Sequence, residues 1–533
     1  MRFKYFALFG LLAAFAVSAC TQERVTYSEP LHHAPARTRD AAVSQAALSL
    51  YAEYETANYE QYADNPVKST IASPLSTFSL NVATASYPNV RRFLESAQLP
   101  PENAVRTEEL LNYFPAGRNH DMMRLGDSPF EVDYQLTPCP WNKKNVLFYL
   151  HLRALDPAPE AMPPANLVFL VDVSGSMNSN ERLPMAKEAL KALVNELRPE
   201  DKISIVTYSG NVRLALRSTS GEMKRKIRET IDELNASGST AGGEGLLMAY
   251  EQAEKNFIRG GINRIIMCTD GDFNVGVSST AELEKLVSEK RDKGVTLSIL
   301  GFGTNNLNDE MMMHIADCGN GNYSYIDKMS EAQKVMGEEL RATFVTVAKD
   351  AKAQIEFNPA QVLEYRQIGY ELRQLAAEQF NDDKVDAGDI GAGKDVIVMY
   401  ELTLAGGEPK LDPLRYQNGV ATASGEFSNE LAFIKLRWKS PEALEKPDMP
   451  SQSVSLPISR DEIAPSFENL GGDMVFYAAV AAYGQKLRNN PALAETSWKD
   501  IEAWADVSSQ YDENGYRKEF LRLVRIAASL SAK

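Results

Sequence analysis

The sequence predicts an α/β protein: a Rossmann-like, doubly wound module inserted in a β-sandwich, with helical N- and C-terminal segments. Three observations support this prediction. Short apolar runs alternate with helical stretches over 166–344, alternating apolar and polar strand patterns flank this region on both sides, and helical patterns occupy 71–125 and 461–533. At 533 residues the chain is also too long for a single hydrophobic core, so several domains are expected.

The central region has the pattern of a parallel sheet covered by helices. Near-continuous β-branched runs are typical of parallel strands that are buried on both faces, and crossover helices then give a doubly wound sheet. The predicted strands are 166–171, 203–208, 212–216, 264–268, 295–300 and 322–326, and the predicted helices are 184–197, 221–235, 243–258, 281–293 and 330–342.

Oxygen-bearing side chains gather where two of these strands end. Asp172, Ser174 and Ser176 directly follow the first apolar run, and Asp270 ends another. Thr240 lies between them in a glycine-rich loop. Hard oxygen ligands suit Mg²⁺, and open α/β sheets bind ligands beyond the carboxyl ends of their strands. The alternative is a set of helix caps and turn residues, because Ser, Thr and Asp are favoured there as well.

This D-x-S-x-S, Thr and Asp set, in that order, resembles the metal-ion-dependent adhesion site (MIDAS) of von Willebrand factor type A domains. The resemblance implies that 166–344 is a type A domain and that the cofactor is Mg²⁺ or Mn²⁺. It implies that both serines and, in the open form, the threonine bind the metal directly, while the two aspartates act mostly through water. The implied metal ligands are Asp172, Ser174, Ser176, Thr240 and Asp270. No residue is predicted to be catalytic.

The first nineteen residues are a predicted targeting segment. Arg2 and Lys4 precede an apolar stretch that closes with Val17-Ser-Ala-Cys20. That ending resembles a bacterial lipobox, which implies cleavage before Cys20 and its acylation, including palmitate. Thr21, in place of Asp, favours the outer over the inner membrane under enteric-type sorting. An ordinary signal peptide and a short membrane anchor are the alternatives.

The rest of the chain divides into a tether, a sandwich and two helical ends. Polar residues 20–70 predict a flexible tether, 71–125 an N-terminal helical module, and 461–533 a C-terminal helical region with two apolar stripes. Strand patterns in 126–165 and 345–460 predict the two halves of the sandwich. The spacing of the cysteines predicts no disulfide framework for Cys139, Cys268 and Cys318, although the sequence is compatible with a bridge between two of them.

Taken together, the N-terminal module, the type A pattern and the C-terminal region resemble YfbK-like bacterial lipoproteins of the von Willebrand factor type A domain family. In that family the C-terminal domain has no known function. Related sequences have acidic residues where this chain has Asn81 and Ala83, so no second ion site is expected there.

The predicted function is that of a membrane-anchored cell-envelope binding or adhesion protein, facing the periplasm or the surface. It would capture a protein partner whose Asp or Glu carboxylate completes the Mg²⁺ site. The net charge of −16 argues against a nucleic-acid partner. A structural envelope-assembly factor with a purely structural metal is the alternative. A metal-dependent hydrolase is less favoured, because it would need a base beside a metal-bound water and the site offers carboxylates only as metal ligands.

Overall fold

The structure is a computed structural model. It describes residues 57–117, 122–157, 162–240, 242–271, 280–304, 307–412, 427–444, 449–467, 470, 473–506 and 512–532. The predicted signal segment, the lipidation site Cys20 and residues 20–56 of the predicted tether lie outside these residues. No helix of the described part is both long enough and apolar enough to span a membrane.

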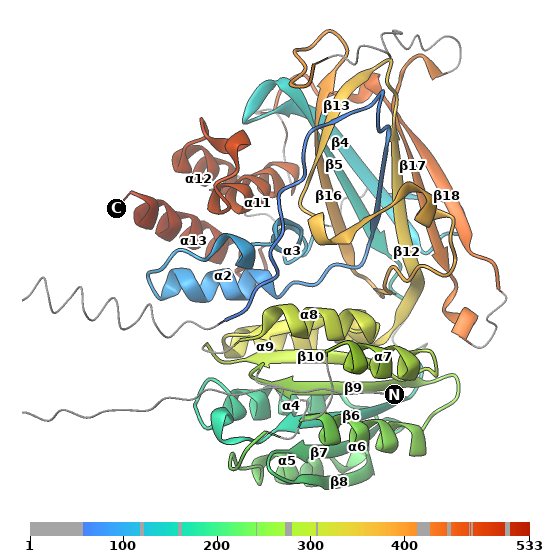
Figure 1. The fold of residues 1–533 in the computed structure, drawn as a ribbon, viewed down its shortest axis with the longest axis vertical. Helices are drawn as coiled ribbons and strands as arrows, with labels where there is room; N and C mark the ends of the chain where they lie inside the picture. The colour runs from blue at the N-terminus through green and yellow to red at the C-terminus, as the bar shows by residue number, and fades with distance from the viewer. Residues whose placement is uncertain are drawn as a thin grey trace, which may run out of the picture. The chain divides into compact units, whose positions relative to one another are not determined.

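The α/β module contains a six-stranded sheet in the order β11-β10-β9-β6-β7-β8 (Figure 1). Its strands are β6 (Ala165–Asp172), β7 (Lys202–Tyr208), β8 (Val212–Ser220), β9 (Ile262–Thr269), β10 (Thr296–Phe302) and β11 (Tyr323–Ile326). All neighbours pair in parallel except β7 and β8, which are antiparallel. A connection of only three residues can join only antiparallel strands, so including 212–216 among the parallel strands was wrong.

Helices cover both faces of this sheet. They are α4 (Leu183–Glu196), α5 (Lys224–Asp232), α6 (Gly242–Lys255), α7 (Thr280–Arg291), α8 (Asp309–Cys318), α9 (Met329–Gln333) and α10 (Leu340–Phe344). One hydrophobic core contains side chains of α4, α5 and α9, and a second core on the other face contains side chains of α6, α7 and α8. The predicted doubly wound fold is therefore confirmed. A π-helical turn, Lys334–Glu338, interrupts the predicted helix 330–342.

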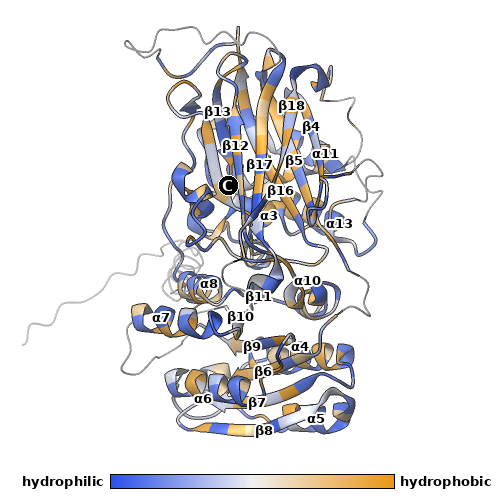
Figure 2. Ribbon diagram, turned by 90° about the vertical axis from the view of Figure 1, so that its right-hand side faces the viewer, coloured by the Kyte–Doolittle hydropathy of each residue, from blue (hydrophilic) through white to orange (hydrophobic). Residues whose placement is uncertain are grey.

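Two further sheets pack face to face as the sandwich. One has the order β1-β13-β16-β5-β4-β3, and the other has the order β14-β2-β12-β17-β18 with β15 paired to β12. Their bounds are β1 (Lys68–Ser69), β2 (Leu75–Ser79), β3 (Met123–Arg124), β4 (Phe130–Cys139), β5 (Asn142–Ala154), β12 (Thr346–Phe357), β13 (Val362–Ile368), β14 (Gln374–Leu375), β15 (Ile390–Gly391), β16 (Asp395–Leu404), β17 (Glu430–Lys439) and β18 (Gln452–Ser459). Figure 2 shows apolar and polar residues alternating along these strands. The α/β module is inserted between β5 and β12, as predicted.

The helical ends of the chain form one layer. The N-terminal helices α2 (Ser86–Glu95) and α3 (Thr107–Leu111) share a core with α11 (Asp473–Leu487), α12 (Trp498–Asp506) and α13 (Tyr516–Ser531). Tyr149 of β5 and Met399 of β16 belong to the same core, so this layer covers the outer face of one sandwich sheet. Almost every residue of α11 is buried, which is broader than the single predicted stripe.

The predicted limits of the tether and of the N-terminal module need correction. Strand β2 lies inside the predicted helical module, yet it pairs with β12 in the sandwich. Strand β1 lies inside the predicted tether, yet it pairs with β13. Tyr59 is 9% exposed, and the Tyr62 hydroxyl donates a hydrogen bond to the Val105 carbonyl at 2.7 Å. These short segments gain their order from partners far along the chain, which no local pattern reveals.

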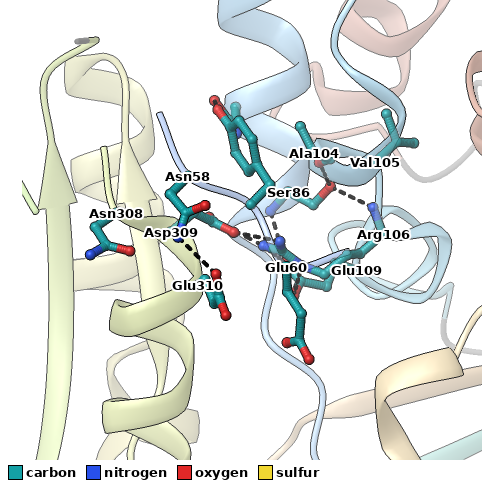
Figure 3. A network of polar contacts seen from close by, with 12 residues as sticks. Asn58, Glu60, Ser86, Ala104, Val105, Arg106, Glu109, Asn308, Asp309 and Glu310 are labelled. Carbon is teal, nitrogen blue, oxygen red and sulfur yellow. Dashed lines mark hydrogen bonds and ion pairs between the residues drawn. The ribbon is translucent and has the colours of Figure 1, made fainter. Parts of the chain in front are cut away.

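Buried arginines join the helical layer to the α/β module. Arg106 is 1% exposed and donates hydrogen bonds to Glu109 at 2.6 Å and to Asp309, the first residue of α8, at 2.5 Å. Figure 3 shows this cluster beside Asn58, whose side chain reaches Glu310 at 2.7 Å. Buried charges are tolerated where several ionic partners compensate them, and this cluster meets that condition.

The three described cysteines are free thiols. Cys139 and Cys268 are buried, and Cys318 is partly buried. Cys268 on β9 is a small core residue, and burial raises the pKa of its thiol. The bridge that the sequence left open is therefore absent from this structure.

Candidate metal centre

Two neighbouring strands bring the acidic residues to one edge of the α/β sheet. Asp172 is the last residue of β6, and Asp270 follows β9 directly. The two strands pair in parallel with Val171 opposite Cys268, so both carboxylates emerge at the carboxyl end of the sheet. Asp172 is fully buried and Asp270 is 1% exposed. Two anionic groups are thus held together away from water.

The loop after β6 turns two hydroxyls toward each other. The Ser174 amide donates a hydrogen bond to Asp172 Oδ1 at 2.8 Å, and the Oγ atoms of Ser174 and Ser176 lie 2.9 Å apart. A short 3₁₀ turn, Gly175–Met177, follows, and its Met177 side chain is buried in the module core. This apolar anchor holds the hydroxyls over the strand end.

The loop that carries Thr240 lies against the first loop. The Gly175 amide donates to the Gly238 carbonyl at 2.9 Å, and the Ser237 amide donates to the Val173 carbonyl at 2.7 Å. Gly238 has a φ of +83°, a conformation that favours glycine. Thr240 itself is partly buried. Among the described residues, no hydrogen bond joins its side chain to the other four predicted ligands.

A basic side chain that the sequence analysis did not identify also reaches the site. Arg182 Nη1 lies 3.0 Å from Asp270 Oδ2, and the same nitrogen donates to the Ser176 carbonyl at 2.6 Å. Gly303, with a φ of +85°, leaves room for it, because a Cβ there would lie 2.4 Å from Arg182 Nε. The sequence signal was a basic residue ten positions after Asp172, just before the predicted helix 184–197.

Burial changes the acid–base behaviour of Asp172. Desolvation raises the pKa of its carboxyl to about 6, and the nearby charge of Asp270 acts in the same direction. Asp172 Oδ2 is buried, and hydrogen bonding from Ser174 and Tyr208 offsets the effect of desolvation on the pKa only in part. An additional cation beside this oxygen would compensate the desolvated charge.

The donor set fits a divalent metal. Asp172, Ser174, Ser176 and Asp270 converge from two adjacent strand ends, and Thr240 lies on the neighbouring loop. Octahedral Mg²⁺ with ligands at about 2.0–2.1 Å places neighbouring ligand atoms roughly 3 Å apart. The hydroxyl separation of 2.9 Å matches that spacing. Residue 241, next to Thr240, and residues 272–279, which follow Asp270, lie outside the described residues.

The described histidines are engaged elsewhere. His151 is buried and lies 2.7 Å from Asp395, and His314 Nε2 lies 3.2 Å from Glu60. Asp317, three residues after His314 on α8, accepts a hydrogen bond from Arg373 at 2.6 Å. Ser174 and Ser176 have each other as hydroxyl partners. The described geometry therefore gives neither serine a histidine that would activate it as a nucleophile.

Family models match three parts of the chain. Residues 53–149 match a model described as von Willebrand factor, residues 166–338 match the von Willebrand factor type A domain, and residues 342–530 match the C-terminal region of the uncharacterized protein YfbK. Type A domains typically mediate protein–protein interaction and adhesion, and they typically hold a divalent metal at this position.

Individual proteins resemble the chain over different shares of its length. Uncharacterized protein YfbK of Escherichia coli is 52% identical over 491 residues, covering 91% of this chain and 84% of the relative. Human inter-alpha-trypsin inhibitor heavy chain H3 is 26% identical over 281 residues, covering 49% of this chain and 31% of that protein. A solved von Willebrand factor type A protein from Catenulispora acidiphila is 15% identical, with a TM-score of 0.42, covering 76% of this chain and 91% of its own. The 52% identity to YfbK over most of both chains confirms the predicted family, and the chain belongs to the YfbK-like proteins with a von Willebrand factor type A domain.

Proposed function

We propose that this protein is a membrane-anchored binding protein of the cell envelope that captures a protein partner through Mg²⁺ or Mn²⁺. The main observation in support is that two buried carboxylates, of Asp172 and Asp270, and a pair of hydroxyl oxygens 2.9 Å apart converge at adjacent strand ends. The proposed ligands are Asp172, Ser174, Ser176, Thr240 and Asp270. We assign these residues to binding rather than to catalysis, because neither Ser174 nor Ser176 has a histidine partner among the described residues.

The charge of the site favours an acidic partner residue. Asp172 and Asp270 together supply two negative charges, and the three hydroxyl ligands supply none. A bound divalent ion would thus remain electrophilic enough to accept one further anionic oxygen. Ser176 and Thr240 are only partly buried, so the site has an open side. A single Asp or Glu side chain of the partner suits this position, because a charged carboxylate displaces metal-bound water better than a neutral carbonyl does.

Anchoring is the second part of the proposal. Acylation of Cys20 would hold the protein on a membrane, preferentially the outer one, facing the periplasm or the surface. The motif Val17-Ser-Ala-Cys20 supports it. Residues 20–56 would then act as the tether, because the chain is packed against the body from residue 57 onward.

The experiment compares wild type with Thr240→Ala, each immobilised as the full mature chain, in Mg²⁺ and in EDTA. Crosslinked proteins from an envelope extract are quantified by mass spectrometry. A genuine partner is retained severalfold better by wild type in Mg²⁺ than under the other three conditions. Thr240 is a partly buried loop residue, so its substitution leaves the fold intact, which circular dichroism verifies. Equal retention under all four conditions would mean that the metal is structural and that recognition lies elsewhere.

A further inference from the structure

A cavity lies at the opposite end of the type A sheet from the candidate metal centre. Its volume is about 830 Å³, within the range of roughly 300–1,000 Å³ typical of small-molecule sites. The amino-terminal ends of β9 and β10 form one wall, and the start of β12 with the short helix Pro441–Leu444 forms the other. Arg264 lies six positions before Asp270, about 20 Å along an extended chain, so the two sites are separate.

Arg264 lines this cavity with an incompletely satisfied guanidinium. The residue is 4% exposed, and its Nη1 donates to Ser298 Oγ at 2.7 Å. Its Nε has no hydrogen-bond partner among the described residues. An arginine carries five N–H donors, and burying them without acceptors is costly.

Arg106, another deeply buried arginine, behaves differently. It is 1% exposed and holds two carboxylates, Glu109 and Asp309, within 2.6 Å. Burial alone lowers the pKa of Arg106, yet Asp309 and Glu109 raise it well above its usual value. Burial instead lowers the pKa of Arg264 to about 10, and the charge of the nearby Asp389 offsets this only in part. Arg264 is therefore a buried cation that has no ion pair with a carboxylate among the described residues.

The surroundings of Arg264 suit an anion attached to an apolar group. The lining contains four basic residues, Arg259, Arg264, Lys293 and Lys349, against three acidic ones, Asp292, Asp389 and Glu442. Of these acids, Asp389 is already 3.5 Å from Lys349. Phe257, which is 41% exposed, and Phe344 add aromatic surface to the wall.

We propose that this cavity binds a small organic acid, whose carboxylate or phosphate pairs with the Arg264 guanidinium while its apolar part packs against Phe257. A guanidinium fork matches both oxyanions with two parallel hydrogen bonds. The site is independent of the metal-dependent function, and neither needs the other.

The test uses benzoate, phenyl phosphate and inorganic phosphate as probes, titrated into the full mature chain by calorimetry. The variants are Arg264→Met, Phe257→Ser and, as a control, Arg225→Met, whose side chain is 91% exposed elsewhere in the same domain. At least one aromatic probe is expected to bind wild type and the control equally. Arg264→Met should weaken that binding at least tenfold, because it removes the charged donors. Benzoate and phenyl phosphate distinguish a carboxylate ligand from a phosphate ligand.

Phe257→Ser keeps the proposal testable if Arg264→Met does not fold. That surface substitution should weaken the aromatic probes severalfold and leave inorganic phosphate unaffected, because only the apolar contact is lost. EDTA should change none of these affinities. The proposal is overturned if no probe binds wild type at concentrations up to about 10 mM. Equal binding by wild type and a folded Arg264→Met, or by wild type and Phe257→Ser for the aromatic probes, also overturns it.

Discussion

At the scale of single residues, Arg182 places a positive charge inside the candidate metal centre. Its guanidinium contacts both Asp270 and the Ser176 carbonyl. Charges a few ångströms apart interact strongly in a partly buried site, so this arginine stabilises the acidic pair and opposes an incoming divalent ion. The affinity of the site for metal is then a balance between the two cations.

Replacing Arg182 with Gln should therefore tighten Mn²⁺ binding several-fold, because the competing charge disappears while a polar side chain remains. Calorimetric titration of the full mature chain measures this. Arg182→Lys, which keeps the charge, should stay close to wild type. The Asp172→Ala, Ser174→Ala double variant should lose binding and sets the baseline. Weaker binding by Arg182→Gln would instead mean that Arg182 positions Asp270 for the metal.

At the scale of elements, the contact between α8 and the N-terminal helices depends on the buried ion pairs of Arg106 with Glu109 and Asp309. Arg106→Met should destabilise the protein by about 3–5 kcal/mol, because it leaves Glu109 and Asp309 buried without their cation. Denaturant unfolding measures the change. The control is Arg225→Met, whose exposed pair with Glu229 at 3.8 Å contributes less than about 1 kcal/mol. Similar losses in both variants would contradict a special role for Arg106.

The segment around Asn65, which follows the proposed tether, is bonded to Glu371, a carboxyl group whose pKa is raised. Glu371 Oε1 accepts a hydrogen bond from the Asn65 amide at 3.3 Å. Burial, together with the charge of Glu108, raises the pKa of Glu371 from 4.5 to about 8. The folded state thus binds this proton more tightly than the unfolded state does, so the contribution to stability is present below pH 4.5 and is lost as the pH rises to about 8.

Thermal unfolding between pH 5 and 8 tests this linkage. The melting temperature of wild type should fall across the window relative to that of Glu371→Gln, whose side chain has no proton to lose. Glu229→Gln, on an exposed helix face, serves as the control and should follow wild type. Parallel curves for wild type and Glu371→Gln would show that Glu371 does not titrate in this range.

At the scale of the whole molecule, the proposed attachment to a membrane depends on a single residue, Cys20. Cys20→Ala should abolish labelling by radioactive palmitate and release the protein from the membrane fraction. Each buried methylene of an acyl chain contributes about 0.8 kcal/mol, so losing all the chains removes stable attachment. Cys318→Ala, which removes a partly buried thiol of the type A domain, is the matched control and should label normally. Normal labelling of Cys20→Ala would refute the lipobox interpretation.

Many of the helices and strands could be predicted because each has a characteristic pattern of apolar and polar residues within a short stretch of the chain. The strand ending at Asp172, the run before Asp270 and the helix after Ser176 each show their type within about ten residues. Apolar periodicity reflects burial of one or both faces, so it survives without knowledge of the partner. The candidate ligands at the strand ends, such as Asp172 and Asp270, could be predicted from the same local patterns, because ligands bind at strand ends in such sheets.

By itself, then, the sequence determined the α/β class, the insertion in a sandwich and the identity of the candidate ligands. The tertiary structure alone decided that β2 pairs with β12, that Arg182 reaches Asp270, that Arg106 joins α8, and that Arg264 lines a cavity. The physical reason is the distance along the chain. Strand pairing, ion pairs and cavities depend on which distant surfaces meet, and a local pattern of apolar and polar residues specifies only that a surface must be buried, not its partner.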